Sequence, residues 1–364
     1  MILAAAIVEF STAALLHNAR TAREYAPNSK LIAVIKANAY GHGAVQVARI
    51  LEAEAEAEVD AFAVARLDEA LSLRDAGIKK KILVLQGFTQ IEELTIFHEH
   101  QLDAVVHSEY QIEYLENSQI NASLSVWLKI DTGMNRLGVQ PAQFKLLLTR
   151  LRECRSVADE VKFMTHFANA DDRQDRKTQQ QESCFIETIN DETGQKSAAN
   201  SAAIIAFPVA HYDWNRAGLM LYGASPILDE SAQVLGLKPV MNFYARVIAV
   251  QQLQKGDAVG YGGSWIAPKN MCLAVVSAGY GDGYPRAAKS GTPVIINNQQ
   301  ASLAGRVSMD MLTVDLTGCN DINIGDKVTL WGDGLPINEI AQSAGTIPYT
   351  LMCGITARVR RVWL

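Results

Sequence analysis

Apolar residues in the first part of the chain form short runs, separated by longer stretches with helical spacing. The runs are rich in Val, Ile and Ala, which is typical of parallel strands covered on both faces. Eight runs fit this description: Ile32–Lys36, Ala61–Ala65, Ile82–Gln86, Ala104–His107, Ser125–Ile130, Phe163–Phe167, Ser197–Ala199 and Trp214–Ala217. Helical spacing occurs in Ala44–Glu56, Leu67–Ala76, Gln140–Cys154 and Arg173–Asn190. Eight strands that alternate with helices predict a closed (β/α)8 barrel.

The pattern changes after Leu235, where strand-like runs follow one another with turn signals between several of them. The expected strands are Phe243–Leu253, Met271–Ser277, Thr292–Ile296, Leu312–Leu316, Lys327–Trp331 and Ile355–Trp363, and Ile337–Ala344 is the one expected helix. Strands without intervening helices predict a second, mainly β domain. We place the barrel in residues 1–232 and the C-terminal β domain in residues 233–364. We interpret the apolar opening, Met1–Val8, as a strand.

Composition and charge narrow the class of protein. Hydrophobic residues make up 49% of the 364 residues and charged residues 20%, as in globular proteins with large cores. The net charge of −6 disfavours nucleic-acid binding, and no apolar run approaches the ~18 residues that span a bilayer. The five cysteines are widely spaced with no CxxC pair, so we expect neither disulfides nor a metal site. Reduced thiols and the lack of a basic secretory start predict a cytoplasmic protein.

Lys36 stands at the end of the first apolar barrel strand. Burial there would lower its pKa from the reference value of about 10.4, because desolvation penalises the charged amine. A neutral amine at a barrel mouth is a nucleophile suited to forming a Schiff base. On spacing alone, a strand-end lysine that simply reaches solvent is an equally good interpretation.

Unusual polar residues gather at the same end of the other predicted strands. They are Lys129, Asp131, Asn135 and Arg136 after the fifth strand, Thr165, His166 and Asn169 after the sixth, Asn200 and Ser201 after the seventh, and Asn215, Arg216 and Gly218 at the eighth. Active sites of (β/α)8 barrels lie at this end, and phosphate groups commonly bind the loops after strands seven and eight. The pattern therefore indicates a phosphorylated cofactor beside a reactive lysine.

These features resemble the alanine racemase family, and the similarity runs along nearly the whole chain. The most specific segment is Ala33–Gly43, which is similar to the family's cofactor-lysine signature. The other similar segments are Lys129–Gly138, Thr165–Ala168, Asn200–Ala202, Asn215–Gly218, Gly260–Gly262, Gly279–Arg286, Gly305–Asp310 and Thr346–Tyr349. The resemblance implies a barrel that binds pyridoxal 5'-phosphate and a β domain that completes the site.

The resemblance also implies how the cofactor is held. Lys36 would bind it as an aldimine and act as one catalytic base. The phosphate would meet the hydroxyls of Tyr40, Ser201 and Tyr349 and the backbone N–H groups of Gly218 and Leu219. Arg216 would face the pyridine nitrogen and, because arginine does not give up its proton, would leave that nitrogen unprotonated. His166 would lie against the cofactor ring and brace Arg216.

The substrate contacts follow from the same resemblance. Arg136 and the backbone N–H of Met309 would bind the substrate carboxylate. Lys129 is often carbamylated in the family, which would let it orient Arg136, although a lysine that faces solvent is the alternative. The substrate entrance and its support would involve Tyr280, Asp282, Tyr284, Arg286, Arg306 and Asp310.

Tyr261 is the second expected base, because racemisation removes a proton on one face of the Cα and returns one on the other. The resemblance places Tyr261 in the partner's site and implies a head-to-tail homodimer. The implied activity is the interconversion of L-alanine and D-alanine, which supplies D-alanine for peptidoglycan. A racemase that also accepts serine stays open. A decarboxylase of the same fold is disfavoured by Arg216 and by the lack of a triple-glycine run, and a binding module by the whole further domain.

Overall fold

The computed structural model describes residues 5–54, 59–120 and 123–364. Within these ranges the chain forms two compact units, which are described separately. The barrel unit comprises Leu16–Leu221 and Ser225–Gly236. The β unit comprises the described residues up to Leu15, together with Tyr222–Ala224 and Leu237–Leu364.

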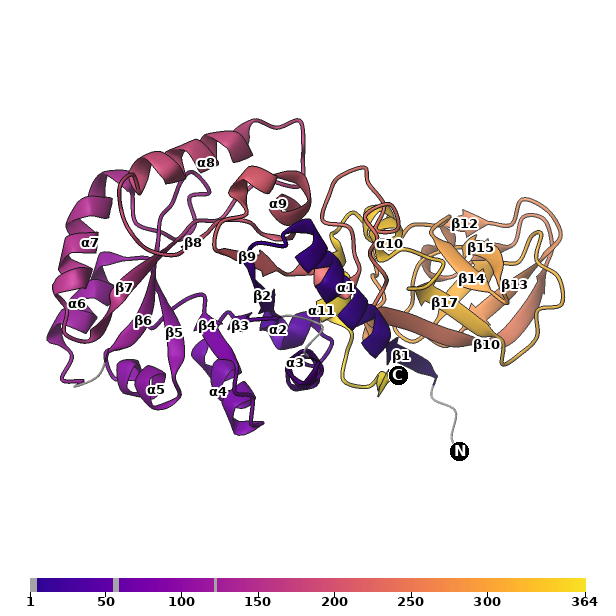
Figure 1. Ribbon diagram of the computed structural model, residues 1–364. Coiled ribbons are helices and arrows are strands. Elements are labelled where there is room, and N and C mark those ends of the chain that lie inside the picture. Colours follow the sequence, from indigo (N-terminus) through magenta and orange to yellow (C-terminus); the bar gives the residue numbers. More distant parts are fainter. Residues whose placement is uncertain (1–4, 55–58, 121–122) are drawn as a thin grey trace. The chain divides into compact units, whose positions relative to one another are not determined.

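Eight parallel strands form the barrel and confirm the predicted (β/α)8 pattern (Figure 1). They are β2 (Lys30–Val34), β3 (Ala61–Val64), β4 (Lys81–Val84), β5 (Leu102–Val106), β6 (Leu124–Lys129), β7 (Val157–Met164), β8 (Lys196–Ser197) and β9 (Trp214–Ala217). The strand order is β8-β7-β6-β5-β4-β3-β2-β9, and Ile32 pairs with both Ala61 and Arg216. The two end strands meet where the Arg216 N–H donates to Ala199 O at 3.0 Å, which closes the barrel.

Helical segments precede the first barrel strand and alternate with the strands after it. They are α1 (Thr12–Tyr25), α2 (Lys36–Tyr40), α3 (Ala44–Ala53), α4 (Leu67–Asp75), α5 (Glu93–Glu99), α6 (Glu109–Asn117), α7 (Phe144–Glu153), α8 (Lys177–Thr188) and α9 (Ser201–Ala206), with short 3-10 turns at Pro141–Gln143, Pro208–Ala210 and Leu219–Tyr222. The four helices predicted by spacing are confirmed. The expected helix Ala44–Glu56 ends earlier, at Ala53, because Glu54 is extended, and the rest of that prediction lies outside the described residues.

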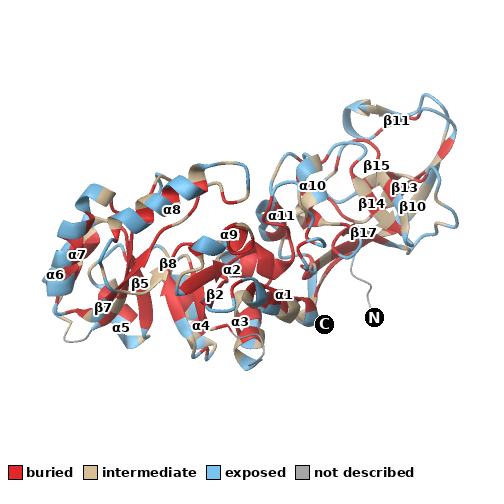
Figure 2. Ribbon diagram, turned by 45° about the horizontal axis from the view of Figure 1, so that its top comes forward, coloured by how far each residue is buried: buried red, intermediate tan, exposed pale blue. Residues whose placement is uncertain are grey.

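Burial follows the predicted pattern (Figure 2). All four residues of β3 are buried, as expected for a strand between helices and the barrel interior. On α7, Phe144, Leu147, Leu148 and Leu151 are buried, and their i, i+3, i+4, i+7 spacing forms the apolar face that packs on the strands. The rings of Phe144 and Phe163 meet edge to face with centroids 5.6 Å apart.

The β unit contains one eight-stranded sheet and a two-stranded ribbon. The sheet holds β1 (Ala6–Phe10), β10 (Met241–Leu253), β13 (Met271–Val276), β14 (Pro293–Ile296), β15 (Gln299–Leu303), β16 (Leu312–Asp315), β17 (Lys327–Trp331) and β18 (Arg360–Trp363), and the ribbon is β11 (Ala258–Val259) with β12 (Trp265–Ile266). Each of the six predicted strands overlaps an observed strand, but the last begins at Arg360 and not at Ile355. The expectation of one helix was wrong, because α11 (Pro348–Gly354) follows α10 (Ile337–Ser343). Helix α11 is short and begins at a proline, which hides its periodicity.

The opening segment is a strand, as predicted, for its described part Ala6–Phe10. Residues 1–4 lie outside the described ranges. The strand β1 pairs antiparallel with β10 and parallel with β18, so it belongs to the sheet of the β unit. The sequence division placed it with the barrel. The barrel is already closed by β9 and offers no free edge, whereas β10 and β18 each present an edge to β1.

None of the helices in the described ranges has the length and apolar character needed to cross a membrane.

A buried ion pair lies near the beginning of the barrel strands. Lys162 Nζ is 3.1 Å from Asp103 Oδ2, and the Trp127 indole N–H donates to the same oxygen at 3.2 Å. The lysine amine also donates to Ser125 Oγ at 2.8 Å. Removing one partner would leave the other charge buried and unpaired, which costs far more than the pair contributes.

We expect Asp103→Leu to lower the free energy of unfolding of the barrel by about 3 kcal/mol, because Lys162 loses its counter-charge. The double variant Asp103→Leu, Lys162→Met should recover most of the loss, since no charge is then buried. Urea unfolding followed by tryptophan fluorescence measures both. A double variant as unstable as the single variant would show that packing, not charge, dominates here.

Candidate active site

The carboxyl ends of the barrel strands bring together the polar residues that the sequence singled out. Lys129 is the last residue of β6, His166 follows β7 by two residues, Ser201 begins α9, and Arg216 lies within β9. Lys36 comes two residues after β2, and the ladder continues to its neighbour Ile35, whose N–H donates to Ala63 O at 2.9 Å. These placements agree with the expected rim cluster.

The backbone after Lys36 is left-handed. Ala37, Asn38, Ala39 and Tyr40 have φ values of 50°, 53°, 53° and 52°, so α2 is not a right-handed helix. L-residues avoid this conformation at about 1–2 kcal/mol each. Such strain persists only when surrounding contacts determine the conformation, and it concentrates at functional sites.

The left-handed turn brings Tyr40 to the loop after β9. A Cβ added to Gly218 would lie 2.8 Å from Tyr40 Oη and 3.8 Å from Ser201 Oγ, so a larger residue here would displace the Tyr40 hydroxyl. Ser201 Oγ accepts the N–H of Gly218 at 2.7 Å and of Met220 at 3.3 Å. The Tyr40 and Ser201 hydroxyls therefore lie beside the backbone of the loop after β9, and hydroxyl and backbone N–H groups are the donors that bind phosphate groups.

Arg216 is a buried cation with a full set of partners. Its guanidinium donates to Ser197 Oγ at 2.6 Å, to Thr165 O at 2.6 Å and to Ala198 O at 2.9 Å. It also lies 3.2 Å from His166 Nδ1. Burial lowers the pKa of Arg216 to about 10, so it is still protonated at neutral pH. The sequence interpretation missed Ser197, whose only signal was a small polar residue in an apolar strand.

His166 is neutral in this setting. Burial first, and then the charge of Arg216, holds the pKa of the imidazole well below its usual value. Its Nδ1 can therefore accept the guanidinium N–H, and the expected contact between the two residues is present. Their action on a cofactor stays a prediction.

Lys129 is buried among other cations. Burial lowers its pKa to about 7, and the neighbouring charges of Arg216, Arg136 and Lys36 act in the same direction. Asp131 opposes the shift. Lysine at this position is thus partly neutral at pH 7, and it does not face solvent.

Hydrogen bonds shape the loops that carry Arg136 and His166. Asp131 Oδ1 accepts the N–H groups of the three residues that follow Thr132, each at 3.0 Å. The hydroxyls of Thr132 and Thr165 are 2.7 Å apart, which ties the loop after β6 to the loop after β7. Gln181 on α8 accepts the N–H of Ala168 at 2.8 Å and donates to His166 O at 3.1 Å. Sequence reasoning missed Gln181, because a polar residue inside a helix gives no sign of what it reaches.

The remaining candidates lie in the β unit. Tyr261 begins a 3-10 turn and is 72% exposed, and Met309 is 53% exposed. Arg358 bonds both Asp282 oxygens at 2.8 and 2.9 Å and Asp310 at 2.7 Å, and so joins the segments that bear Tyr280 and Met309. Arg306 and Arg286 are exposed, and so is Tyr349 on α11.

Tyr284 differs from the expectation. It is 1% exposed and stacks on Trp331, with ring centroids 6.1 Å apart. Burial raises the pKa of its phenol. The structure thus assigns Tyr284 to the core of the β unit, because an aromatic ring in an apolar surrounding buries its surface, and not to the lining of an entrance.

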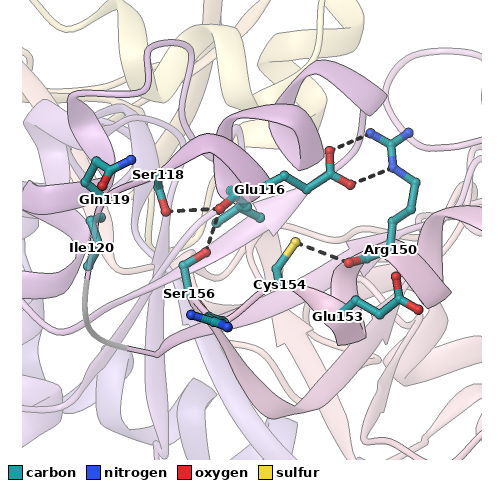
Figure 3. A pocket seen from close by; sticks show the side chains of 10 residues that line it. Glu116, Ser118, Gln119, Ile120, Arg150, Glu153, Cys154 and Ser156 are labelled. Carbon is teal, nitrogen blue, oxygen red and sulfur yellow. Dashed lines mark hydrogen bonds and ion pairs between the residues drawn. The ribbon is translucent and has the colours of Figure 1, made fainter.

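A large hollow at the opposite end of the barrel strands lies away from these residues. Its volume is about 650 Å³, and its lining comes from the segments before β6 and β7 (Figure 3). Arg150 turns toward Glu116 there, with N–O distances of 2.8 Å, and also pairs with Glu109. These charges satisfy one another, and this end of a barrel serves stability.

Comparisons with known proteins agree with the geometry. Residues 10–226 match the family described as alanine racemase, N-terminal domain, and residues 240–363 match alanine racemase, C-terminal domain. The chain is 47% identical to an alanine racemase of Nitrosococcus oceani and 44% identical to a biosynthetic alanine racemase of Escherichia coli, each over 98% of both chains. The crystal structure of biosynthetic alanine racemase from Pseudomonas aeruginosa is similar with a TM-score of 0.95 and 42% identity, covering 100% of both chains. The alanine racemase of Acinetobacter baumannii has a TM-score of 0.92 and 36% identity, also with full coverage.

Lys129 gives the stability of the barrel a pH dependence of known sign. Its pKa is about 7 in the folded chain and 10.5 ordinarily, so between these values the unfolded chain holds a proton that the folded chain has lost. Stability from this group is complete above about pH 10.5 and is lost as the pH falls toward 7.

We expect wild type to gain about 2 kcal/mol more stability than Lys129→Met between about pH 6.5 and about pH 9. Methionine keeps the length of the side chain and carries no proton. The measurement is urea unfolding in buffers free of carbon dioxide, so that the amine stays unmodified. Parallel stability curves for the two proteins would mean that the lysine is charged throughout this range.

Proposed function

The chain belongs to the alanine racemase family and interconverts L-alanine and D-alanine, and on this premise we propose which residues perform the reaction. The observation that carries the proposal is the convergence of Tyr40, Ser201 and Gly218 into a phosphate cradle in the barrel mouth that also holds Lys36 and Arg216. The matched proteins are named alanine racemases, which disfavours the decarboxylase interpretation. The same names do not favour a racemase of broader specificity that also accepts serine.

We propose that the barrel mouth binds pyridoxal 5'-phosphate, the cofactor of this family. The cradle of hydroxyls and N–H groups fits its phosphate, and the cationic surroundings favour an anion. Tyr349 and the Leu219 N–H would complete the phosphate contacts. Lys36 would attach the cofactor covalently. When bound, pyridoxal phosphate draws electrons from the Cα of the amino acid and acidifies its proton.

Two groups would move that proton. The Lys36 amine would serve one face of the Cα and the Tyr261 phenol the other, so that one group removes the Cα proton and the other donates its own proton to the opposite face. Arg216 would face the ring nitrogen and, as a permanent cation, would donate a hydrogen bond without releasing a proton. An unprotonated ring nitrogen would withdraw fewer electrons from the Cα, which would favour rapid return of a proton to the Cα. His166 would brace the guanidinium, consistent with the 3.2 Å contact.

Arg136 and the Met309 N–H would bind the substrate carboxylate. Lys129 would orient Arg136 as a carbamate, and a pKa of about 7 supports this, because only the neutral amine reacts with carbon dioxide. Tyr280, Arg286 and Arg306 would line the entrance. Asp282 and Asp310 would hold its shape through Arg358, consistent with their short ion pairs.

We propose a head-to-tail homodimer in which Tyr261 and Met309 complete the partner's site. Both residues are strongly exposed, and Met311 beside them is 44% exposed. The neighbouring exposed side chains of Met309 and Met311 support a surface that a second chain covers. Cys154, Cys184, Cys272 and Cys319 form no disulfide, which supports a reducing, cytoplasmic location. There the enzyme would supply D-alanine for peptidoglycan.

The covalent role of Lys36 is tested by trapping. After borohydride reduction of the protein incubated with pyridoxal phosphate, wild type should gain the mass of the reduced cofactor on the peptide that contains Lys36. We expect Lys36→Ala to gain none and to lose racemase activity, because no other amine replaces it. Lys145→Ala, an exposed change on α7, is the control and should behave as wild type. Labelling of Lys36→Ala at the wild-type level would refute the assignment.

Shared sites are tested by mixing two inactive variants. In a mixed dimer of Lys36→Ala and Tyr261→Phe, one of the two sites has both intact bases. Random exchange makes about half of the dimers mixed, so we expect about a quarter of wild-type activity. Each variant alone should stay inactive. No recovery after exchange, with mixed dimers shown by native mass spectrometry, would place both bases in one subunit.

A further inference from the structure

The left-handed turn after Lys36 is not explained by its own residues. None of the residues from Ala37 to Tyr40 is glycine, yet all have φ near 50°. Alanine and tyrosine have no local reason to adopt this conformation. Side-chain contacts must therefore hold the turn, and with it the directions in which Lys36 and Tyr40 point.

One holding contact comes from the next barrel repeat. Glu69 lies in the first turn of α4, and its Oε2 accepts the N–H groups of Ala65 at 2.8 Å and Arg66 at 3.1 Å. Its other oxygen, Oε1, accepts the N–H of Ala37 at 2.6 Å. The first oxygen closes the start of its own helix, as a capping glutamate does. The second oxygen, Oε1, binds the N–H of Ala37, which is the first left-handed residue and directly follows Lys36.

The far end of the turn is held from within. Asn38 Oδ1 accepts the N–H of Ala44 at 2.9 Å, at the start of α3. His42 Nδ1 lies 3.0 Å from the carbonyl oxygens of Ala39 and Tyr40. Burial lowers the pKa of His42 to about 4, so the neutral ring donates its single N–H here. The turn is thus fixed at its end by its own signature residues and at its beginning by Glu69.

We propose that Glu69 is a positioning residue, whose carboxylate locks the left-handed turn and thereby aims Lys36 and Tyr40 into the barrel mouth. The inference rests on the proposed roles of those two residues. The chemistry requires a carboxylate, because both oxygens accept hydrogen bonds from backbone N–H groups. A glutamine at this position has one accepting oxygen, and its amide N–H₂ would face a donor.

The chain contains a matched control. Glu93 occupies the first turn of α5, and its Oε2 accepts the N–H groups of Thr89 at 2.7 Å and Gln90 at 3.3 Å. It caps its own helix as Glu69 does, and these bonds stay beside that helix. Glu69→Gln and Glu93→Gln therefore make the same chemical change at two helix starts, and the first alone alters the support of Lys36.

The first measurement is amide hydrogen exchange of the full chain without cofactor. We expect the peptide that covers Ala37–Ala44 to exchange about tenfold faster in Glu69→Gln than in wild type, because a hydrogen bond to a charged acceptor is lost. Glu93→Gln should leave that peptide unchanged. Equal exchange in wild type and Glu69→Gln, or equal acceleration in both variants, would overturn the proposal.

The second measurement is made on the holoenzyme. Glu69→Gln should weaken pyridoxal phosphate binding and lower kcat about tenfold with a smaller effect on KM for alanine, since the carboxylate contacts of the substrate are untouched. Glu69→Asp keeps two accepting oxygens and should recover part of the cofactor affinity and part of kcat. This variant also tests the proposal if Glu69→Gln impairs folding. Wild-type kinetics in Glu69→Gln would also overturn the proposal. Failure of Lys36 trapping would instead refute the proposed function, and the exchange result would stand by itself.

Discussion

The buried guanidinium of Arg216 is the interaction on which the barrel mouth depends. The seam between β8 and β9 is the weakest part of the barrel, because β8 is only two residues long. Arg216 bridges this seam in two ways. Its backbone N–H donates a hydrogen bond to Ala199 O, and its guanidinium donates to Ser197 Oγ and Ala198 O. A further bond to Thr165 O extends the link to β7. The residue that we propose to face the cofactor ring therefore also closes the sheet, so a substitution at Arg216 would affect both the site and the barrel.

The partners of Arg216 satisfy its hydrogen bonds without cancelling its charge. They are carbonyl oxygens, a hydroxyl and a neutral imidazole. Burial lowers the pKa of Lys129 to about 7 and holds the pKa of His166 well below its usual value, and the charge of Arg216 adds to both shifts. Asp131 is close enough to oppose the shift of Lys129, but one of its oxygens is already used by the N–H groups of its own loop. An incoming phosphate and a substrate carboxylate would supply the negative charge, so the mouth is organised for anions in advance.

Sequence reasoning succeeded where a feature repeats along the chain. The period of the barrel strands was readable in the sequence, and the rule that active sites follow the strands brought Lys36, His166 and Arg216 to one rim. It failed where a single residue acts through space. β15 was missed because Gln299 and Gln300 hide its strand pattern, and the partners of β1 depend on which edges the fold leaves open. Ser197, Gln181 and Glu69 look like ordinary polar residues until the loops that they tie are known.

The candidate residues of the β unit are exposed, and contacts beneath them must therefore fix their backbone. Arg358 achieves this by holding Asp282 through both oxygens and Asp310 through one, while Gly281 N–H donates to Met309 O at 2.8 Å. The Met309 backbone is therefore fixed while its side chain stays exposed. A surface of this kind loses little conformational entropy when a second chain covers it, so more of the contact energy contributes to association. Rigid support beneath exposed groups is what the proposed shared site would require.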